Sequence, residues 1–167
     1  MPPDDPEGKA LAFTRRAEST GDQPLLLALF IAARAHQFAP LNLPAATLEM
    51  LMRQQFQAQD AGFLARYPAA RREVVDVDGV SVGRLVSDQT GDRLHLVDIA
   101  LTPPYRNRGL GGALISQLQD EARAAGLAMS LRVAIDNVRA TALYARLGFE
   151  TTASDDMNLE MRWTAPG

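Results

Sequence analysis

Seven consecutive residues, Arg106 to Gly112, combine two arginines with three glycines in the order Arg-Asn-Arg-Gly-Leu-Gly-Gly. Residues 94–101 before them have the apolar character of a strand, and an apolar pattern of helical spacing follows them up to Gly126. The glycines therefore fall in the first turn of a predicted helix, where unpaired main-chain N–H groups and the helix dipole attract anions. Because glycine has no Cβ, phosphate oxygens can approach this main chain closely. The arrangement predicts a pyrophosphate-binding loop, with Arg106 and Arg108 adding positive charge.

Two other kinds of phosphate-binding loop do not fit these letters. A Walker-type loop ends in Gly-Lys-Ser or Gly-Lys-Thr, whereas this loop ends in Gly111-Gly112-Ala113. The dinucleotide fingerprint requires a small third residue where this chain has Leu114. For the loop taken alone, a glycine-rich helix start without any ligand is the structural alternative.

A second block lies downstream, from Asn137 to Phe149, with the letters Asn-Val-Arg-Ala-Thr-Ala-Leu-Tyr-Ala-Arg-Leu-Gly-Phe. Together the two blocks resemble the Gcn5-related N-acetyltransferase (GNAT) superfamily. That family's acyl-CoA loop has the pattern Arg-x-x-Gly-x-Gly, and its later segment has the pattern Asn-x-x-Ala-x-x-Leu-Tyr-x-x-x-Gly-Phe. Two blocks in the right order are far more specific than either alone. The resemblance is detailed from Val97 to Phe149 and rests on the order of elements before that.

The predicted elements extend the resemblance over nearly the whole chain. Valines on both sides of Asp78-Gly79 predict a tight hairpin, because this pair suits the positive φ angles of such a turn. The expected order is strand, two helices, three strands, helix, strand, helix and two strands. This order matches the topology of that superfamily, and the resemblance therefore implies an α/β (α+β) fold, the GNAT-like acyl-CoA N-acyltransferase fold. It has a mixed, mostly antiparallel central sheet of about seven strands flanked by about four helices.

Length and composition suit a single catalytic domain. The chain has 167 residues, of which 47% are hydrophobic, and we expect a flexible leader over residues 1–8 and one GNAT acetyltransferase domain over residues 9–167. The net charge of -3, without a basic run longer than Arg71-Arg72, predicts no nucleic-acid partner. The absence of cysteine excludes a thiolate metal site and a cysteine acyl-enzyme, so any transfer would be direct.

The most hydrophobic run, residues 25–33, is shorter than the roughly 20 residues that a helix needs to span a bilayer. We therefore expect a buried helix and no membrane partner. The acidic, proline-rich start over residues 1–7 lacks the basic and apolar regions of a signal peptide. These features predict a cytoplasmic protein.

The resemblance implies acetyl-CoA as the acyl donor, an amine as the acceptor and no metal. By resemblance, the strand that precedes the loop leaves its neighbour near Ala100 and Leu101, where freed main-chain groups bind the pantetheine arm and face the thioester carbonyl. Asn137, which stands where a helix N-cap is expected, helps to position the cofactor. The residues implied to bind acetyl-CoA are Leu101, Arg106, Asn107, Arg108, Gly109, Leu110, Gly111, Gly112, Asn137 and Tyr144.

Transfer of an acetyl group to an amine requires a deprotonated amine, a stabilised oxyanion and a proton for the departing thiolate. The resemblance implies that Tyr144 lies near the CoA sulfur and acts as the general acid. Gly148 predicts a left-handed helix cap, and Phe149 would pack back on the last turn, which includes Tyr144. A core aromatic without a catalytic role is the alternative for this tyrosine.

The general base is harder to name from the sequence. Some family members have a glutamate at the position of Leu96, and leucine cannot accept a proton. Asp98 is predicted to point to the same face and to be catalytic, either directly or through a water, with a structural hydrogen-bonding role as the alternative. His95 is predicted on the opposite face in a structural role, and His36 near a helix end.

Acceptor recognition, by resemblance, belongs to residues 25–67 and 154–158. Glutamines of the second helix and Tyr67 are candidates to line an acceptor pocket, and a solvated face is the alternative. The acceptor is either a small amine or a protein amino group. An acyl-CoA sensor or interaction module without catalysis is the alternative function, and a longer acyl group is a third case. The apolar ending suits a homodimer or a core-facing strand, and it comprises Met157, Leu159, Met161 and Trp163.

Overall fold

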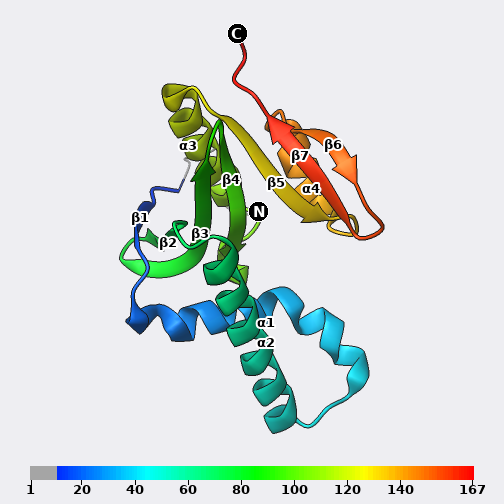
Figure 1. The fold of residues 1–167 in the computed structure, drawn as a ribbon. Coiled ribbons are helices and arrows are strands. Elements are labelled where there is room, and N and C mark those ends of the chain that lie inside the picture. Colours follow the sequence, from blue (N-terminus) through cyan, green and yellow to red (C-terminus); the bar gives the residue numbers. More distant parts are fainter. Residues whose placement is uncertain (1–10) are drawn as a thin grey trace, which may run out of the picture.

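The structure is a computed structural model that describes residues 11–167, so the predicted leader over residues 1–8 lies outside the described residues. Its centre is a seven-stranded sheet in the order β1-β2-β3-β4-β5-β7-β6 (Figure 1). Among the strands of residues 11–167, only β4 and β5 pair in parallel. The strands are β1 (Thr14–Ala17), β2 (Arg71–Val77), β3 (Val80–Thr90), β4 (Arg93–Leu101), β5 (Ala128–Ala134), β6 (Glu150–Ser154) and β7 (Asn158–Trp163). The helices are α1 (Gln23–Phe38), α2 (Ala45–Arg66), α3 (Leu110–Ala125) and α4 (Val138–Arg146).

This arrangement confirms the predicted fold class and order of elements. The helix expected over residues 25–33 is longer than predicted, since α1 extends to Phe38. The hairpin between β2 and β3 turns at Asp78 and Gly79, whose φ angles are 50° and 77°. Two successive positive φ angles match the right-handed twist of the paired strands, as the Asp-Gly pair predicts.

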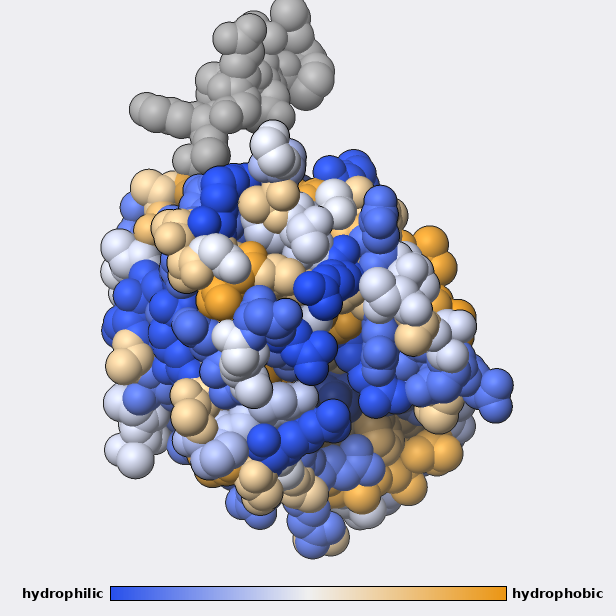
Figure 2. All heavy atoms as spheres, turned by 45° about the horizontal axis from the view of Figure 1, so that its top comes forward, coloured by the Kyte–Doolittle hydropathy of each residue, from blue (hydrophilic) through white to orange (hydrophobic). Residues whose placement is uncertain are grey.

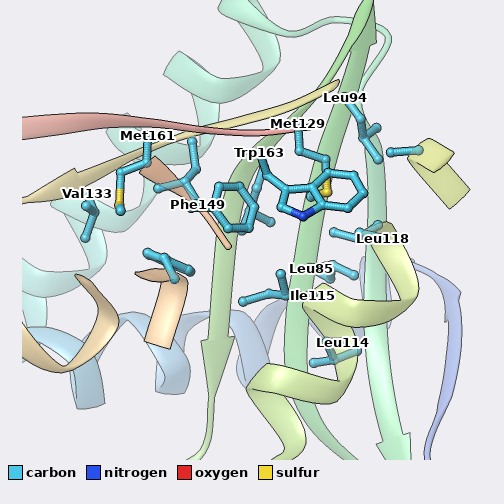
Figure 3. Close-up of a cluster of buried hydrophobic side chains, with 14 of the residues drawn as sticks. Leu85, Leu94, Leu114, Ile115, Leu118, Met129, Val133, Phe149, Met161 and Trp163 are labelled. Carbon is cyan, nitrogen blue, oxygen red and sulfur yellow. The ribbon is translucent and has the colours of Figure 1, made fainter. Parts of the chain in front are cut away.

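Two apolar clusters lie on opposite faces of the sheet. The larger one joins α3 and α4 to β2–β5 and β7, and the smaller one joins α1 and α2 to Ala100 of β4. In the close-up, Trp163 and Met129 lie above Ile115 and Leu118 of α3 (Figure 3). In Figure 1, α1 and α2 lie together below the strands, and their connected ends extend beyond the sheet.

Strand β4 carries a β-bulge that opens the sheet. Ser87 of β3 is paired with Leu96 and Val86 is paired with Asp98, so Val97 is an extra residue without a partner on β3. Pairing of β4 with β5 also ends at Leu96, which is opposite Leu131. A bulge bends its strand and interrupts pairing. The predicted point of separation near Ala100 and Leu101 is therefore wrong, because the strands part after Leu96.

Helix α1 is only partly covered. With its flanking 3₁₀ turns it forms a 22-residue helical segment, Thr20–Leu41, that is long and apolar enough to cross a membrane by length and composition alone. Core helices of soluble proteins pass the same test. Only Leu26, Leu29 and Phe30 of α1 are buried, so the expectation of a short, buried helix is only partly correct. The face drawn in Figure 2 is mostly hydrophilic, with apolar residues in smaller groups.

Candidate active site

The glycine-rich loop presents unpaired amides at the start of α3, as predicted. Ala113 is the first residue of the helix whose amide finds a main-chain acceptor, the Gly109 oxygen at 3.0 Å. Within the described part of the chain, the amides of Leu110, Gly111 and Gly112 have no main-chain acceptor. Together with the helix dipole, these donors form a site for an anion such as a pyrophosphate.

The three glycines of this loop differ in how strictly the fold requires glycine at their positions. Gly109 has a φ of 80°, in the left-handed region that strains residues with a Cβ. A Cβ on Gly111 would lie 3.8 Å from Leu143 Cδ2, and one on Gly112 would lie 3.6 Å from Leu143 Cδ1. Both distances are ordinary contacts, so the fold requires glycine at the first position and leaves room for alanine at the other two.

The polar side chains of the loop hold it in place. The Arg106 Nε donates a hydrogen bond to the Leu101 oxygen at 3.0 Å, which ties the loop to the end of β4. Arg139 of α4 donates to Asn107 Oδ1. Arg108 is exposed, and its guanidinium carbon lies 5.3 Å from the centre of the Tyr105 ring. Arg106 and Asn107 thus have structural partners in addition to their predicted role in binding acetyl-CoA.

The opening between β4 and β5 exposes main-chain groups of β4. The Thr102 N–H donates to the Val82 oxygen at 2.8 Å, so Thr102 and Val82 form a hydrogen-bonded pair of the antiparallel ladder. Hydrogen-bonded and non-hydrogen-bonded pairs alternate along antiparallel strands. Leu101, paired with Gly83, therefore turns its N–H and C=O away from β3 and toward the opening. This orientation fits the main-chain role that the resemblance implies for Leu101.

Tyr144 lies on α4 and is 8% exposed. Its ring meets the Phe149 ring edge-on, with centres 5.9 Å apart. The Phe149 amide donates to the main-chain carbonyl oxygen of Tyr144 at 3.0 Å. Gly148 between them has a φ of 93°, so the predicted helix cap is confirmed. At the other end of α4, Asn137 Oδ1 accepts from the Ala140 amide at 3.2 Å, which confirms the predicted N-cap. These contacts fix the tyrosine ring locally.

The surroundings of Tyr144 keep its hydroxyl protonated. Burial raises the pKa of Tyr144 to about 12, and the negative charge of Asp98 acts in the same direction. Gln119 of α3 adds a further constraint, because its Nε2 donates to the Leu147 oxygen at 2.8 Å and so ties the end of α4 to α3. Tyr144, buried within the larger apolar cluster, therefore keeps its proton at neutral pH and stays a candidate proton donor.

Asp98 does not share the face of Leu96, so this prediction is wrong. The bulge at Val97 shifts the alternation by one residue. Leu96 is buried in the α3 and α4 cluster, whereas Asp98 lines a pocket between the sheet and helices α1 and α2. Burial raises the pKa of Asp98, although the charges of Arg84 and Arg34 oppose this shift.

His95 is structural in its contacts, as expected. Its ring stacks on Tyr67 with centres 5.7 Å apart, and Nδ1 lies 2.8 Å from Ser130 Oγ. Burial lowers the pKa of His95, and the positive charges of Arg93 and Arg66 add to this effect. Tyr67 is thus engaged with His95. Among the glutamines of α2, only Gln59 lines the pocket, while Gln54, Gln55 and Gln57 are exposed.

The sequence reasoning missed a buried ring of alternating charges beside this pocket. Arg84 is 4% exposed and contacts Glu18 at 3.2 Å and Asp60 at 2.7 Å. Arg72 contacts the same two carboxylates. The ring joins β2 and β3 to α2 and to the segment after β1. An arginine in the middle of the apolar β3 pattern was the available signal.

Gly83 is another residue that sequence reasoning missed. A Cβ at this position would lie 2.7 Å from Leu101 Cδ2 and 2.8 Å from the Ala100 oxygen, so only glycine lets β3 approach the opened part of β4 this closely. Its signal was a glycine inside a strand pattern. Within residues 11–167, no group of three or more histidine or acidic side chains is arranged to hold a metal ion.

A parallel strand pair that separates after Leu96, a helix start with unpaired amides near Leu101 and a buried tyrosine on the helix after β5 are the features expected of the acyl-CoA N-acyltransferase fold that the sequence resembles. Comparison with known proteins agrees: the acetyltransferase (GNAT) family model matches residues 35–149. The chain therefore belongs to the GNAT family of acetyltransferases.

Two individual proteins illustrate the relationship. An acetyltransferase of Yersinia pestis (strain Pestoides F) is 33% identical over 79 residues, which are 47% of this chain and 56% of that protein. The ribosomal protein bS18 alanine N-acetyltransferase of Escherichia coli (strain K12) is 44% identical over 59 residues, 35% of this chain and 40% of its own length. The matched segments thus span about half of these relatives or less.

Among solved structures, the PaiA N-acetyltransferase from Thermoplasma acidophilum in complex with coenzyme A superposes with a TM-score of 0.71. The superposition covers 93% of this chain and 100% of that one, at 16% sequence identity. At this identity the likeness shows the fold alone.

Proposed function

We propose that this chain is an acetyl-CoA-dependent N-acetyltransferase that transfers an acetyl group to a primary amine by direct attack in a ternary complex. The observation that carries the proposal is the opening of β4 from β5 after Leu96, with the unpaired amides at the start of α3 near its Leu101 end. Tyr144 is buried on the helix that follows β5. The coenzyme A in the PaiA structure and the activity in the name of the E. coli relative support it.

In this proposal the donor is held mainly by main-chain groups. The amides of Leu110, Gly111 and Gly112 bind the pyrophosphate, with charge added by Arg106 and Arg108. The pantetheine arm enters the opening, and the Leu101 N–H faces the thioester carbonyl, where it stabilises the oxyanion that forms. Asn137 holds the start of α4 next to this path.

The reaction then needs two proton transfers. The amine nitrogen attacks the thioester carbon, and the C–S bond breaks when the tetrahedral intermediate collapses. Tyr144 gives its proton to the departing thiolate, and Asp98 accepts the proton from the amine, directly or through a water. With Leu96 buried in the core, Asp98 is the acidic side chain of β4 next to the opening.

The test is isothermal titration with acetyl-CoA, using Gly111→Glu against Gly111→Ala. The wild type is expected to bind with a dissociation constant on the order of micromolar. Glutamate places bulk and negative charge among the amides and should weaken binding at least about 100-fold. Alanine meets only ordinary contacts and should change affinity by less than about 3-fold. Absence of binding to the wild type would refute the proposal, and binding without acetylation of any amine would favour an acyl-CoA sensor.

Two expectations concern the protein as a whole. A cytoplasmic location and a homodimer are both predicted from the sequence, and light scattering tests the second. Of the four residues proposed for a dimer contact, Met161 and Trp163 lie in the core and Leu159 packs against it. Met157 is 75% exposed. A dimer through this edge would therefore use Met157 and the outer strand β6 rather than the whole apolar ending.

A further inference from the structure

The pocket that contains Asp98 is small, and some of its charged side chains form ion pairs while others do not. It has a volume of about 80 Å³ and lies between α1, α2 and the middle of the sheet. Its walls combine apolar side chains with four charged ones, and the lining residues are Leu26, Leu29, Phe30, Ala33, Arg34, Phe56, Gln59, Asp60, Arg84, Asp98, Ile99 and Ala100. The pocket thus reaches β4 directly after the bulge, next to the opening proposed for the thioester.

Two of the four charges are already paired. Arg84 and Asp60 belong to the ring with Glu18 and Arg72, in which each arginine contacts both carboxylates. The ring contains two positive and two negative groups and so is neutral as a unit. Its members Arg84 and Asp60 form part of the pocket wall, and the ring offers no unpaired charge to a ligand.

The other two charged side chains, Arg34 and Asp98, are not part of this ring. Within the described residues neither has an ion-pair contact within 4.0 Å, although they line the same pocket. Arg34 is held in position, since Nη2 donates to Gln59 Oε1 at 2.7 Å and the guanidinium carbon lies 4.0 Å from the centre of the Phe30 ring. A guanidinium has five N–H donors, and a fixed fork of this kind suits a carboxylate.

We infer that the acceptor carries a carboxylate close to its amine, as in an amino acid, and that Arg34 binds this carboxylate while Asp98 faces the amine. The inference rests on the proposed function and names the substrate class of the same site. A positive and a negative group in one small pocket match a zwitterion. A polyamine would instead bring a second positive charge toward Arg34, and a peptide amino terminus would bring a neutral amide.

The experiment measures CoA release with matched acceptors. A panel of L-amino acids is compared with the corresponding amino acid amides, the decarboxylated amines, a peptide beginning with alanine, and spermidine. For the best acceptor, the wild type should show kcat/KM at least about 10-fold higher with the carboxylate than with its amide or amine. Arg34→Gln should remove most of this preference by lowering kcat/KM for the carboxylate acceptor alone. Arg34→Lys should retain part of it, because the charge stays and the fork is lost.

Arg53→Gln is the matched control, because Arg53 is an exposed arginine of α2 whose only ion pair within the described part of the chain is the surface contact with Glu49. It should behave as the wild type does, and thermal unfolding checks that each variant is folded. Equal or faster acetylation of the amide, the amine, the peptide or spermidine would overturn the inference, as would a uniform loss in Arg34→Gln. Binding of acetyl-CoA without acetylation of any carboxylate acceptor would also overturn it. Failure of acetyl-CoA to bind refutes the proposed function instead.

Discussion

On the α3 and α4 side of the β4 opening, the groups available to a ligand are mostly main-chain amides, whereas on the α1 and α2 side they are charged side chains. Leu101, Gly111 and Gly112 contribute backbone on the first side. Arg34 and Asp98 contribute side chains on the second. Main-chain donors remain after most substitutions, whereas a single substitution removes a side-chain group. The difference suggests that the proposed donor site is fixed by the fold and that the proposed acceptor site is adjusted residue by residue.

Tyr144 is buried in the cluster on the α3 and α4 side, and its replacement should have the largest effect. Tyr144→Phe keeps the ring that packs on Phe149 and removes only the hydroxyl. We expect turnover to fall about 10²- to 10⁴-fold, with acetyl-CoA affinity nearly unchanged. Because the pKa of Tyr144 is raised to about 12, the wild-type acid keeps its proton across the neutral range. Steady-state turnover from pH 6 to 10 checks this, and equal turnover of the two proteins at every pH would remove Tyr144 from the mechanism.

The charged ring should make the α1 and α2 side sensitive to a single change. Arg84→Met keeps most of the volume but leaves Glu18 and Asp60 with Arg72 as their remaining partner. We expect the free energy of unfolding to fall by about 3 kcal/mol, measured by urea unfolding at pH 7. Arg53→Met, which breaks only the exposed pair with Glu49, should cost less than about 1 kcal/mol. Equal losses in both variants would mean that the ring has no special weight.

The ring also predicts the pH dependence of stability. Burial tends to raise the pKa of Asp60, but hydrogen bonds from Arg84 and Arg72 outweigh it, and the net shift is downward. A carboxyl group whose pKa is lowered in the native state stabilises the fold at pH values above its ordinary pKa of about 4. This contribution is lost as the pH falls through the native pKa. The wild type should therefore lose stability below about pH 4, and Arg84→Met should lose less over the same range.

Asp98→Asn probes the acceptor side without a change of shape. We expect kcat/KM for the acceptor to fall about 10- to 100-fold, while acetyl-CoA affinity stays the same. Since the base must be ionised and burial raises its pKa, the wild-type kcat/KM should fall with decreasing pH below that raised value. A pH profile of kcat/KM for both proteins is the measurement. An identical acidic limb in the variant would assign the base to a water chain or another residue.

The smallest expected effect is on the donor side, at the start of α4. Asn137→Ala removes the acceptor for the Ala140 amide and should lower the free energy of unfolding by about 1 kcal/mol. If Asn137 also positions the cofactor, the KM for acetyl-CoA should rise a few-fold. A stability loss without any change in this KM would limit Asn137 to its capping role.

The parts that could be predicted from the sequence are those fixed by neighbouring residues. The Asp78-Gly79 turn, the Asn137 cap and the Gly148-Phe149 ending each depend on a few adjacent letters. The loop before α3 could be recognised for the same reason. In each case the local pattern and the final structure agree, because the interactions are made within one or two turns of the chain.

The remainder depended on pairing between distant strands. Val97 decides whether Asp98 shares a face with Leu96, because Val97 has no partner on β3. Nothing in the sequence around Val97 shows that it is unpaired. The ring around Arg84 likewise joins residues from four separate segments. The separation of β4 from β5 follows from the same bulge, so one long-range register shift accounts for both the wrong face and the misplaced opening.

The contact between Trp163 and Gly148 gives the protein an optical signal. Trp163 is the chain's only tryptophan and is 5% exposed. A Cβ on Gly148 would lie 3.2 Å from its indole ring, so the indole rests on the turn that ends the helix of Tyr144. Its fluorescence comes from one environment, and a shift of that helix when a ligand enters the opening would change the emission without any attached dye. A titration that follows this emission would test whether the helix moves when the site is occupied.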